Sequence, residues 1–231
     1  MGKAAKCLHR GQPVTDMTLR PRWHLINRLS LWLWGLLVAS AAVADPTAEL
    51  VARLDANTSL EGRFSQEVRG SDGMTLQRTE GRFWAARPER FRWEVKGRFA
   101  QLLVSDGTRI WHYDPDLQQV IVRPYAGRLT ETPALLLSGG SASIREAFRV
   151  VRTETSHGQE AGFTLYPRQQ DGLIEALELV FSGDHLQRMR VWDGLGQMTL
   201  FEFSELRLNP TLDPGLFVFE PPPGTDVIAD G

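Results

Sequence analysis

Hydrophobic and polar residues alternate along most of the chain after residue 59, with the period of two that is typical of half-buried β-strands. Leu60, Phe64 and Val68 stand among polar neighbours in the first such stretch, and Phe91–Val95 alternates at every position. The pattern predicts strands over the following ranges: Leu60–Val68, Phe91–Val95, Leu102–Val104, Ile110–Tyr113, Gln119–Val122, Phe148–Arg152, Phe163–Tyr166, Leu177–Phe181, Leu186–Trp192 and Met198–Leu208.

Many of these strands are separated by short segments with turn chemistry, rich in Asp, Gly, Ser and Pro. The predicted turns are Gly70–Gly73, Ser105–Gly107, Asp114–Asp116, Asp171–Gly172, Ser182–Asp184 and Asp193–Gly194. Because short strands joined by tight turns pair with their chain neighbours, the sequence predicts an antiparallel meander.

The segment before the first strand has the pattern of a helix instead. Asp45 can cap its N-terminus, Pro46 suits the first helical position, and Leu50 and Leu54 fall four residues apart on one face. These features predict a helix over 46–57 whose apolar face has to cover another part of the molecule.

A second interruption of the strand pattern falls in the middle of the chain. Thr132–Leu137 repeats the combination of cap and proline and predicts a helix near 133–138, and Ser143–Glu146 has the spacing of a capping box, which predicts another short helix. The predicted fold is thus mainly β with short α: one curved antiparallel sheet with two or three apolar helices. Either the helices plug the concave face of the sheet, or the sheet packs on them around a solid core.

The first 44 residues have the features of an export signal. Arg20, Arg22 and Arg28 precede an apolar run over 29–38, and Ala42–Ala44 supplies small residues at the cleavage positions. We therefore expect cleavage after residue 44, which leaves 45–231 as a single domain. Met17 gives the signal a more ordinary beginning than residue 1 and is the alternative start. The alternative is an uncleaved anchor, although the apolar run is short for a membrane-spanning helix.

Cysteine and charge further restrict the class of protein. The only cysteine is Cys7, so the expected mature chain carries no disulfide and no lipid on a cysteine near Asp45. Six Lys/Arg and one Asp/Glu leave with residues 1–44, so 20 basic and 27 acidic residues remain, a net charge of about −7. This charge argues against nucleic acid and against anionic membranes as partners.

The same part of the chain offers little for catalysis. His112, His157 and His185 show no metal-site spacing, and neither a nucleophile elbow nor a phosphate-binding glycine loop is present. Asp114 and Asp116 could touch a calcium ion, but the full calcium-loop pattern is missing. The sequence therefore predicts a binding protein without a cofactor or metal, rather than an enzyme.

Seven short segments together resemble the LolA family of periplasmic outer-membrane lipoprotein carriers, and their order and spacing span nearly all of 45–231. They are Leu60–Gln66, Gly81–Trp84, Arg87–Trp93, Leu103–Gly107, Ile110–Asp114, Thr132–Leu137 and Phe217–Pro222. The resemblance implies an incomplete, half-open antiparallel β-barrel with a helical lid that opens for acyl chains and closes when the carrier is empty.

The resemblance also implies partners. A periplasmic, monomeric carrier of this family takes outer-membrane lipoproteins from an inner-membrane ABC transporter of the LolCDE type. It passes them to LolB, an outer-membrane receptor of similar fold that is itself a lipoprotein. Because no cysteine follows the apolar run, the chain resembles the carrier and not the receptor.

Site residues follow from the same resemblance. Arg87 matches the arginine that holds the lid closed through hydrogen bonds to the helices. Phe91 matches an aromatic residue near the barrel mouth, where a charge would disable transfer more than folding; ordinary core is the alternative for it and for Trp93. The inner surface of the lid and the cavity are expected to include Leu54, Leu135, Leu136, Leu137, Phe64, Trp84, Trp93 and Trp111.

Three other functions stay open on sequence alone. A lipid-sensing regulator of similar fold would usually need a second domain. A periplasmic carrier of another amphiphile, such as a glycolipid or a polyene lipid, would share every feature described above. A hydrolase would be revealed by turnover of acyl esters.

Overall fold

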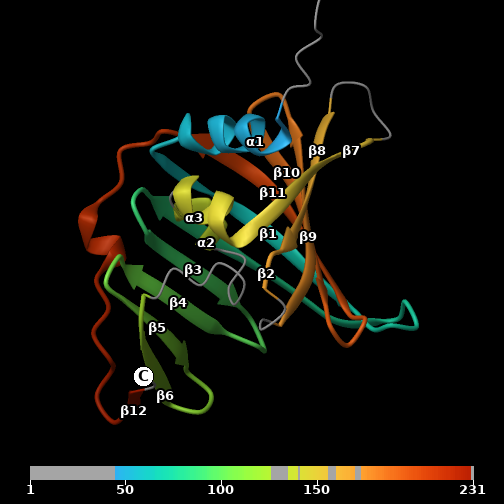
Figure 1. Cartoon of the computed structure of the whole chain (residues 1–231). Coiled ribbons are helices and arrows are strands. Elements are labelled where there is room, and N and C mark those ends of the chain that lie inside the picture. Colours follow the sequence, from blue (N-terminus) through green and yellow to red (C-terminus); the bar gives the residue numbers. More distant parts are fainter. Residues whose placement is uncertain (1–44, 126–134, 140, 156–159, 170–172, 230–231) are drawn as a thin grey trace, which may run out of the picture. The chain divides into compact units, whose positions relative to one another are not determined.

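A computed structural model of the chain describes residues 45–125, 135–139, 141–155, 160–169 and 173–229. All of these belong to one unit, Val43–Gly231 (Figure 1). The helices are α1 (Pro46–Asp55), α2 (Leu135–Ser138), α3 (Ser141–Ala147) and the 3-10 turn η1 (Pro214–Phe217). The strands are β1 (Ser59–Arg69), β2 (Thr75–Ala86), β3 (Arg90–Lys96), β4 (Gln101–Asp106), β5 (Arg109–Asp114), β6 (Gln119–Pro124), β7 (Phe148–Thr153), β8 (Glu160–Pro167), β9 (Ile174–Ser182), β10 (His185–Asp193), β11 (Met198–Leu208) and β12 (Asp226–Ala229).

Two meanders form one curved sheet with the strand order β12-β6-β5-β4-β3-β2-β1-β11-β10-β9-β8-β7. Strands β1–β6 form the first meander and strands β7–β11 the second. The first strand of the one, β1, pairs antiparallel with the last strand of the other, β11, so that Phe64 stands opposite Phe203. The order begins at β12 and ends at β7, so the sheet is open at these two strands. This arrangement confirms the expected incomplete antiparallel β-barrel.

All ten predicted strands are present, but the sequence pattern missed two others. Strand β2 was missed because its first half is largely exposed and lacks alternation, while its second half is buried on both faces. Strand β12 is four exposed residues that pair parallel with β6, which departs from the antiparallel prediction. A strand this short lies at the sheet edge and needs no apolar pattern.

The helices lie in the hollow of the curved sheet, as Figure 1 shows. Helix α1 begins as predicted: the Asp45 side chain accepts a hydrogen bond from the Thr47 backbone N–H at 2.9 Å, and Pro46 follows in the first turn. Leu50 and Leu54 are buried in the main core. The helix ends two residues before the predicted end. Helix α3 is the other predicted short helix, but it begins at Ser141, so Ser143 lies inside it and not at the capping position that the spacing predicted. Of the predicted helix near 133–138, residues 133 and 134 lie outside the described residues, and α2 forms the rest.

Candidate functional site

The concave side of the sheet and the three helices bury one continuous apolar core. The lid residues Leu54, Leu135, Leu136 and Leu137 are all at most 5% exposed and belong to this core. Burying a leucine side chain contributes about 1.5–3 kcal/mol. The helices are therefore held on the sheet largely by non-directional apolar contact, which a similarly apolar ligand can replace.

Aromatic rings line the sheet beneath the helices. Phe64 stacks on Trp93 with ring centroids 3.9 Å apart, and Trp93 also meets Phe201 edge-on at 5.6 Å. Gly81 makes room for this arrangement, because a Cβ there would lie 2.4 Å from the Phe64 ring. Phe64 and Trp93 thus lie on the concave side of the sheet.

Trp84 and Trp111 do not line this side, which corrects the expectation that both face the cavity. Register places Trp84 opposite Arg92, Arg92 opposite Val104, and Val104 opposite Trp111, so all four share the convex face. Trp84 packs there in a separate small cluster with Phe217 of η1. Both tryptophans are covered by the segment after β11, since the Trp111 ring lies 6.4 Å from that of Phe219.

Phe91 is buried and not at an exposed rim. It is 2% exposed, belongs to the main core, and stands between Ala85 of β2 and Ser105 of β4. Phe91 therefore has the position of an ordinary core residue in this structure, and the expectation that it lies at an exposed barrel mouth is corrected.

Arg87 connects the ends of two helices to the β2–β3 turn. Its Nε donates a hydrogen bond to the carbonyl oxygen of Asn57 at 3.0 Å, just beyond the end of α1. Its Nη1 donates to the carbonyl oxygen of Gly139, just beyond α2, and lies 3.5 Å from a carboxylate oxygen of Asp55. Carbonyls at helix C-termini lack partners within the helix, so a guanidinium with several donors suits this position.

The Arg87 guanidinium is largely buried, with 14% of its side chain exposed. Burial lowers the pKa of Arg87, while the neighbouring Asp55 and Tyr125 raise it; arginine nevertheless stays charged at neutral pH. Burial and the charge of Glu89 raise the pKa of the Tyr125 hydroxyl, while Arg87 lowers it, and the result is a pKa of about 12. Tyr125 is therefore neutral at neutral pH. Nη2 of Arg87 finds no hydrogen-bond partner among the described residues.

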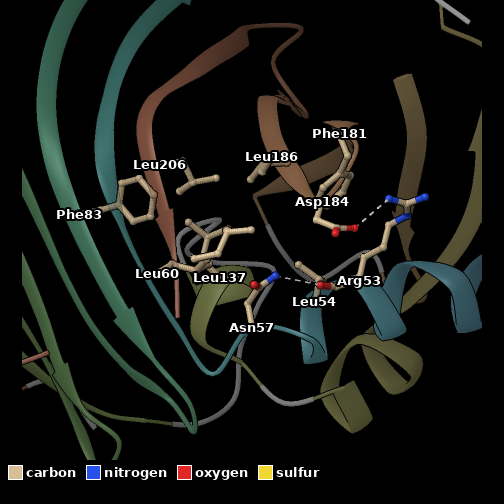
Figure 2. Close-up of a pocket in the computed structure, with 11 residues that line it drawn as sticks. Arg53, Leu54, Asn57, Leu60, Phe83, Leu137, Phe181, Asp184, Leu186 and Leu206 are labelled. Carbon is tan, nitrogen blue, oxygen red and sulfur yellow. Dashed lines mark hydrogen bonds and ion pairs between the residues drawn. The ribbon is translucent and has the colours of Figure 1, made fainter. Parts of the chain in front are cut away.

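A small apolar cavity lies where α1 and α2 meet β1, β2 and β9–β11. Its volume is about 20 Å³, close to the space of a single water molecule. The cavity is drawn in Figure 2, and it is lined by Arg53, Leu54, Asn57, Leu60, Phe83, Leu137, Phe181, Asp184, Leu186, Leu206 and Leu208. Ligand pockets are usually hundreds of cubic ångströms in volume. The core is thus filled in this structure, and an acyl chain needs the helices to move.

A larger hollow of about 360 Å³ lies along β1, β2 and β11, but its lining is mainly polar. Charged side chains such as Arg63, Glu80, Arg82 and Lys96 surround it. An acyl chain would have to desolvate these groups, so this hollow does not suit an apolar ligand.

The sequence analysis missed three residues around the lid: Arg53, Asp55 and Asn57. Asp55 ends α1, where a negative charge is unfavourable to the helix dipole, and this placement was a signal that a cation such as Arg87 lies nearby. Asn57 both accepts from Arg87 and lines the cavity. No comparable signal marked Arg53, because its partner Gly183 is distant in the chain.

The described residues contain no group of three or more His, Cys, Asp or Glu side chains placed to hold a metal ion. Within the same ranges, no helix has the length and apolar character needed to cross a membrane.

The fold and the site define a class of protein: an open antiparallel β-barrel whose aromatic concave face is covered by short apolar helices. Residues 55–220 match the model of the family described as outer membrane lipoprotein carrier protein LolA. The chain belongs to the LolA family.

The sequences of two relatives agree with this assignment. An outer-membrane lipoprotein carrier protein of Chromohalobacter salexigens is 39% identical over 207 residues, covering 86% of this chain and 97% of its own length. One of Azotobacter vinelandii is 42% identical over 193 residues, covering 83% of this chain and 92% of its own. Among solved structures, a LolA superfamily protein of Nitrosomonas europaea is 12% identical with a TM-score of 0.45, covering 75% of this chain and 98% of its own.

Proposed function

We propose that this protein is a lipoprotein carrier that shields acyl chains between the concave face of its sheet and its helices. The observation that carries the proposal is the apolar junction between helices and sheet, where Leu54 and Leu137 lie against Phe83 around a small cavity. The relatives named above are outer-membrane lipoprotein carriers, and this chain spans nearly their whole length.

The energetics explain why such a carrier is needed. Burial of an acyl chain stabilises it by roughly 0.8 kcal/mol per CH₂, so a chain of about fifteen CH₂ groups costs on the order of 12 kcal/mol to expose to water. A lipoprotein with two or three chains therefore does not leave a membrane unaided at a useful rate. When the helices swing out, the aromatic face around Phe64 and Trp93 offers acyl chains an apolar surface in place of water.

We further propose the partners and the route. The protein works as a monomer in the periplasm, takes outer-membrane lipoproteins from an ABC transporter of the LolCDE type and delivers them to a LolB-type receptor. It has no catalytic role and no nucleic-acid partner, in line with the net charge of about −7 over 45–231. Arg87 is the latch that holds the empty carrier closed.

We expect the exported protein to begin at Asp45. The apolar run and the small residues at Ala42–Ala44 support cleavage there, and Asp45 already caps α1 in the structure. N-terminal sequencing and intact mass of the protein recovered from periplasm measure this start. Retention of residues 29–38, or a lipid on the N-terminus, would contradict it.

The carrier function is tested by loading and release. The protein from Asp45 to Gly231 should bind a fluorescent diacylglyceryl lipopeptide and release lipoproteins from donor membranes into solution, while membranes without it should release none. Mass spectrometry of lipids that co-purify from periplasm separates a lipoprotein carrier from a carrier of a glycolipid or polyene lipid. Absence of both lipopeptide binding and release would overturn the function.

A further inference from the structure

We propose that acyl chains enter the core through the seam between α1 and the β9–β10 turn, and that Arg53 is the clasp that closes this mouth. The proposal rests on the carrier function above and adds to it a place of entry and a second closing residue. Arg53 contacts the β9–β10 turn, whereas Arg87 contacts the residues that follow α1 and α2.

The contacts of Arg53 bridge this seam. Its Nη1 donates a hydrogen bond to the carbonyl oxygen of Gly183 at 2.7 Å and lies 4.0 Å from a carboxylate oxygen of Asp184. Its guanidinium carbon lies 6.0 Å from the centre of the Phe181 ring, at the limit of a cation–π contact. The side chain therefore joins the third turn of α1 to both β9 and the turn that follows it, as Figure 2 shows for Asp184.

Beneath Arg53 the seam is apolar and incompletely filled. The small cavity described above is bounded by the charged side chains of Arg53 and Asp184, by Asn57, and otherwise by leucines and phenylalanines. Phe83 and Leu137 in its wall belong to the main core. A path that begins at Arg53 thus leads directly from the edge of the lid to the face that acyl chains have to reach.

The two sides of the lid are closed in different ways. On the Arg87 side, backbone bonds add to the side chain: the Glu89 N–H donates to the Ser138 carbonyl at 2.8 Å, and the Arg87 N–H donates to the Thr58 carbonyl at 2.9 Å. On the Arg53 side, the contacts described between α1 and the β9–β10 turn come from a side chain. A side chain can leave by a change of rotamer, whereas the backbone bonds need the chain itself to move, so this seam opens first.

The clasp is incompletely satisfied. Nε of Arg53 is buried without a hydrogen-bond partner among the described residues, and an unsatisfied buried donor is unfavourable. Glu49 supports the clasp from the same helix, since it accepts from Arg53 Nη2 at 3.3 Å and pairs with Arg152 of β7. Burial raises the pKa of the Glu49 carboxyl. The hydrogen bonds and charges of Arg152 and Arg53 together lower it by more, so the pKa of Glu49 lies below its ordinary value.

The test links α1 covalently to the β9–β10 turn, with a reducible thiol cross-linker between the two cysteines of an Arg53→Cys, Asp184→Cys protein. Cys7 lies outside 45–231, so these are the only thiols of the expected mature chain. The folded protein is purified reduced, checked by circular dichroism, and then linked. We expect the linked protein to load the fluorescent diacylglyceryl lipopeptide at least tenfold more slowly than the wild type, and reduction to restore loading.

The matched control places the same linker on the convex face, in a Glu61→Cys, Arg207→Cys protein. These residues pair across β1 and β11 through an ion pair at 2.6 Å, and Glu61 stands opposite Trp84 on the face of the sheet that the lid does not cover. We expect this control to load like the wild type whether linked or reduced. Equal loading by the linked Arg53–Asp184 protein and its reduced form would overturn the proposed mouth, while failure of the wild type to load would overturn the carrier function instead.

Single variants test the clasp without a linker. Arg53→Leu should load the lipopeptide roughly tenfold faster, since it loses a hydrogen bond from a charged donor that holds only the closed form. Arg53→Lys keeps the charge and a donor, and it should load at nearly the wild-type rate. A folded Arg53→Leu protein that loads no faster than Arg53→Lys would show that Arg53 does not close the mouth.

Discussion

The Arg87→Leu protein should load acyl chains but fail to give them up, with apparent acyl binding tightened tenfold to a hundredfold. The hydrogen bonds from Arg87 to the carbonyls of Asn57 and Gly139 exist only when the helices are closed on the sheet. Their loss therefore destabilises the empty, closed form and leaves the loaded, open form unchanged.

The size of the effect follows from a two-state equilibrium. Hydrogen bonds from a charged donor contribute about 1.5–3 kcal/mol each to the state that contains them, and 1.4 kcal/mol corresponds to a factor of ten. Only the open state binds the ligand, so the apparent affinity equals the intrinsic affinity multiplied by the fraction of protein that is open. A larger open fraction therefore tightens binding. Handover to a LolB-type receptor then becomes unfavourable by the same factor.

The measurement is paired: lipoprotein release from donor membranes, followed by transfer to purified receptor. Arg63→Leu is the matched control, because Arg63 forms an exposed ion pair with Glu205 at 2.9 Å, and such pairs contribute little. It should load and deliver normally. Normal delivery by folded Arg87→Leu protein would show that Arg87 is not the latch, and failure to load would point to docking on the donor.

The Phe91→Glu protein should fail to fold rather than fail to transfer. Phe91 is 2% exposed in the main core, so the new carboxylate would be desolvated without a charged partner built for it. Losing the ring alone costs about 3–5 kcal/mol, and a domain of this kind is stable by only about 5–15 kcal/mol. Urea unfolding followed by circular dichroism measures the loss.

Phe91→Leu separates the fold from the function at this position. A leucine keeps an apolar side chain and removes only part of the volume, so this protein should fold, at a cost below the roughly 3–5 kcal/mol of losing the whole ring. Its release of lipoproteins then reports on acyl contact alone. If Phe91→Glu protein unfolds at the wild-type urea concentration, the position is wet and Phe91 does lie at a mouth.

Local chemistry was enough to predict much of the fold. Asp45 and Pro46 define the start of α1 without help from distant residues, because capping acts within one turn. Turn residues and alternation predicted ten strands, because they too are features of residues that are close together in the sequence. The cap and proline of the segment Thr132–Leu137 predicted a helix, and α2 buries its three leucines, Leu135, Leu136 and Leu137.

The tertiary structure alone decided which face each aromatic side chain takes. Phe83 and Trp84 are adjacent in β2 and both are buried, one in the main core and one against Phe217. Alternation identifies a face only when the other face is polar, and here the segment after β11 covers the convex side as well. That is why Trp84 and Trp111 were expected on the wrong side of the sheet.

Long-range pairing was likewise beyond the sequence pattern. The closure of the two meanders through β1 and β11, and the reach of Arg53 to a carbonyl 130 residues away, depend on how the sheet curves. Arg87 was identified through the family resemblance, but its two carbonyl partners were not. They belong to Asn57, 30 residues before Arg87, and to Gly139, 52 residues after it. Local propensities predict elements, whereas these contacts exist only because apolar burial brings the ends of separate elements together.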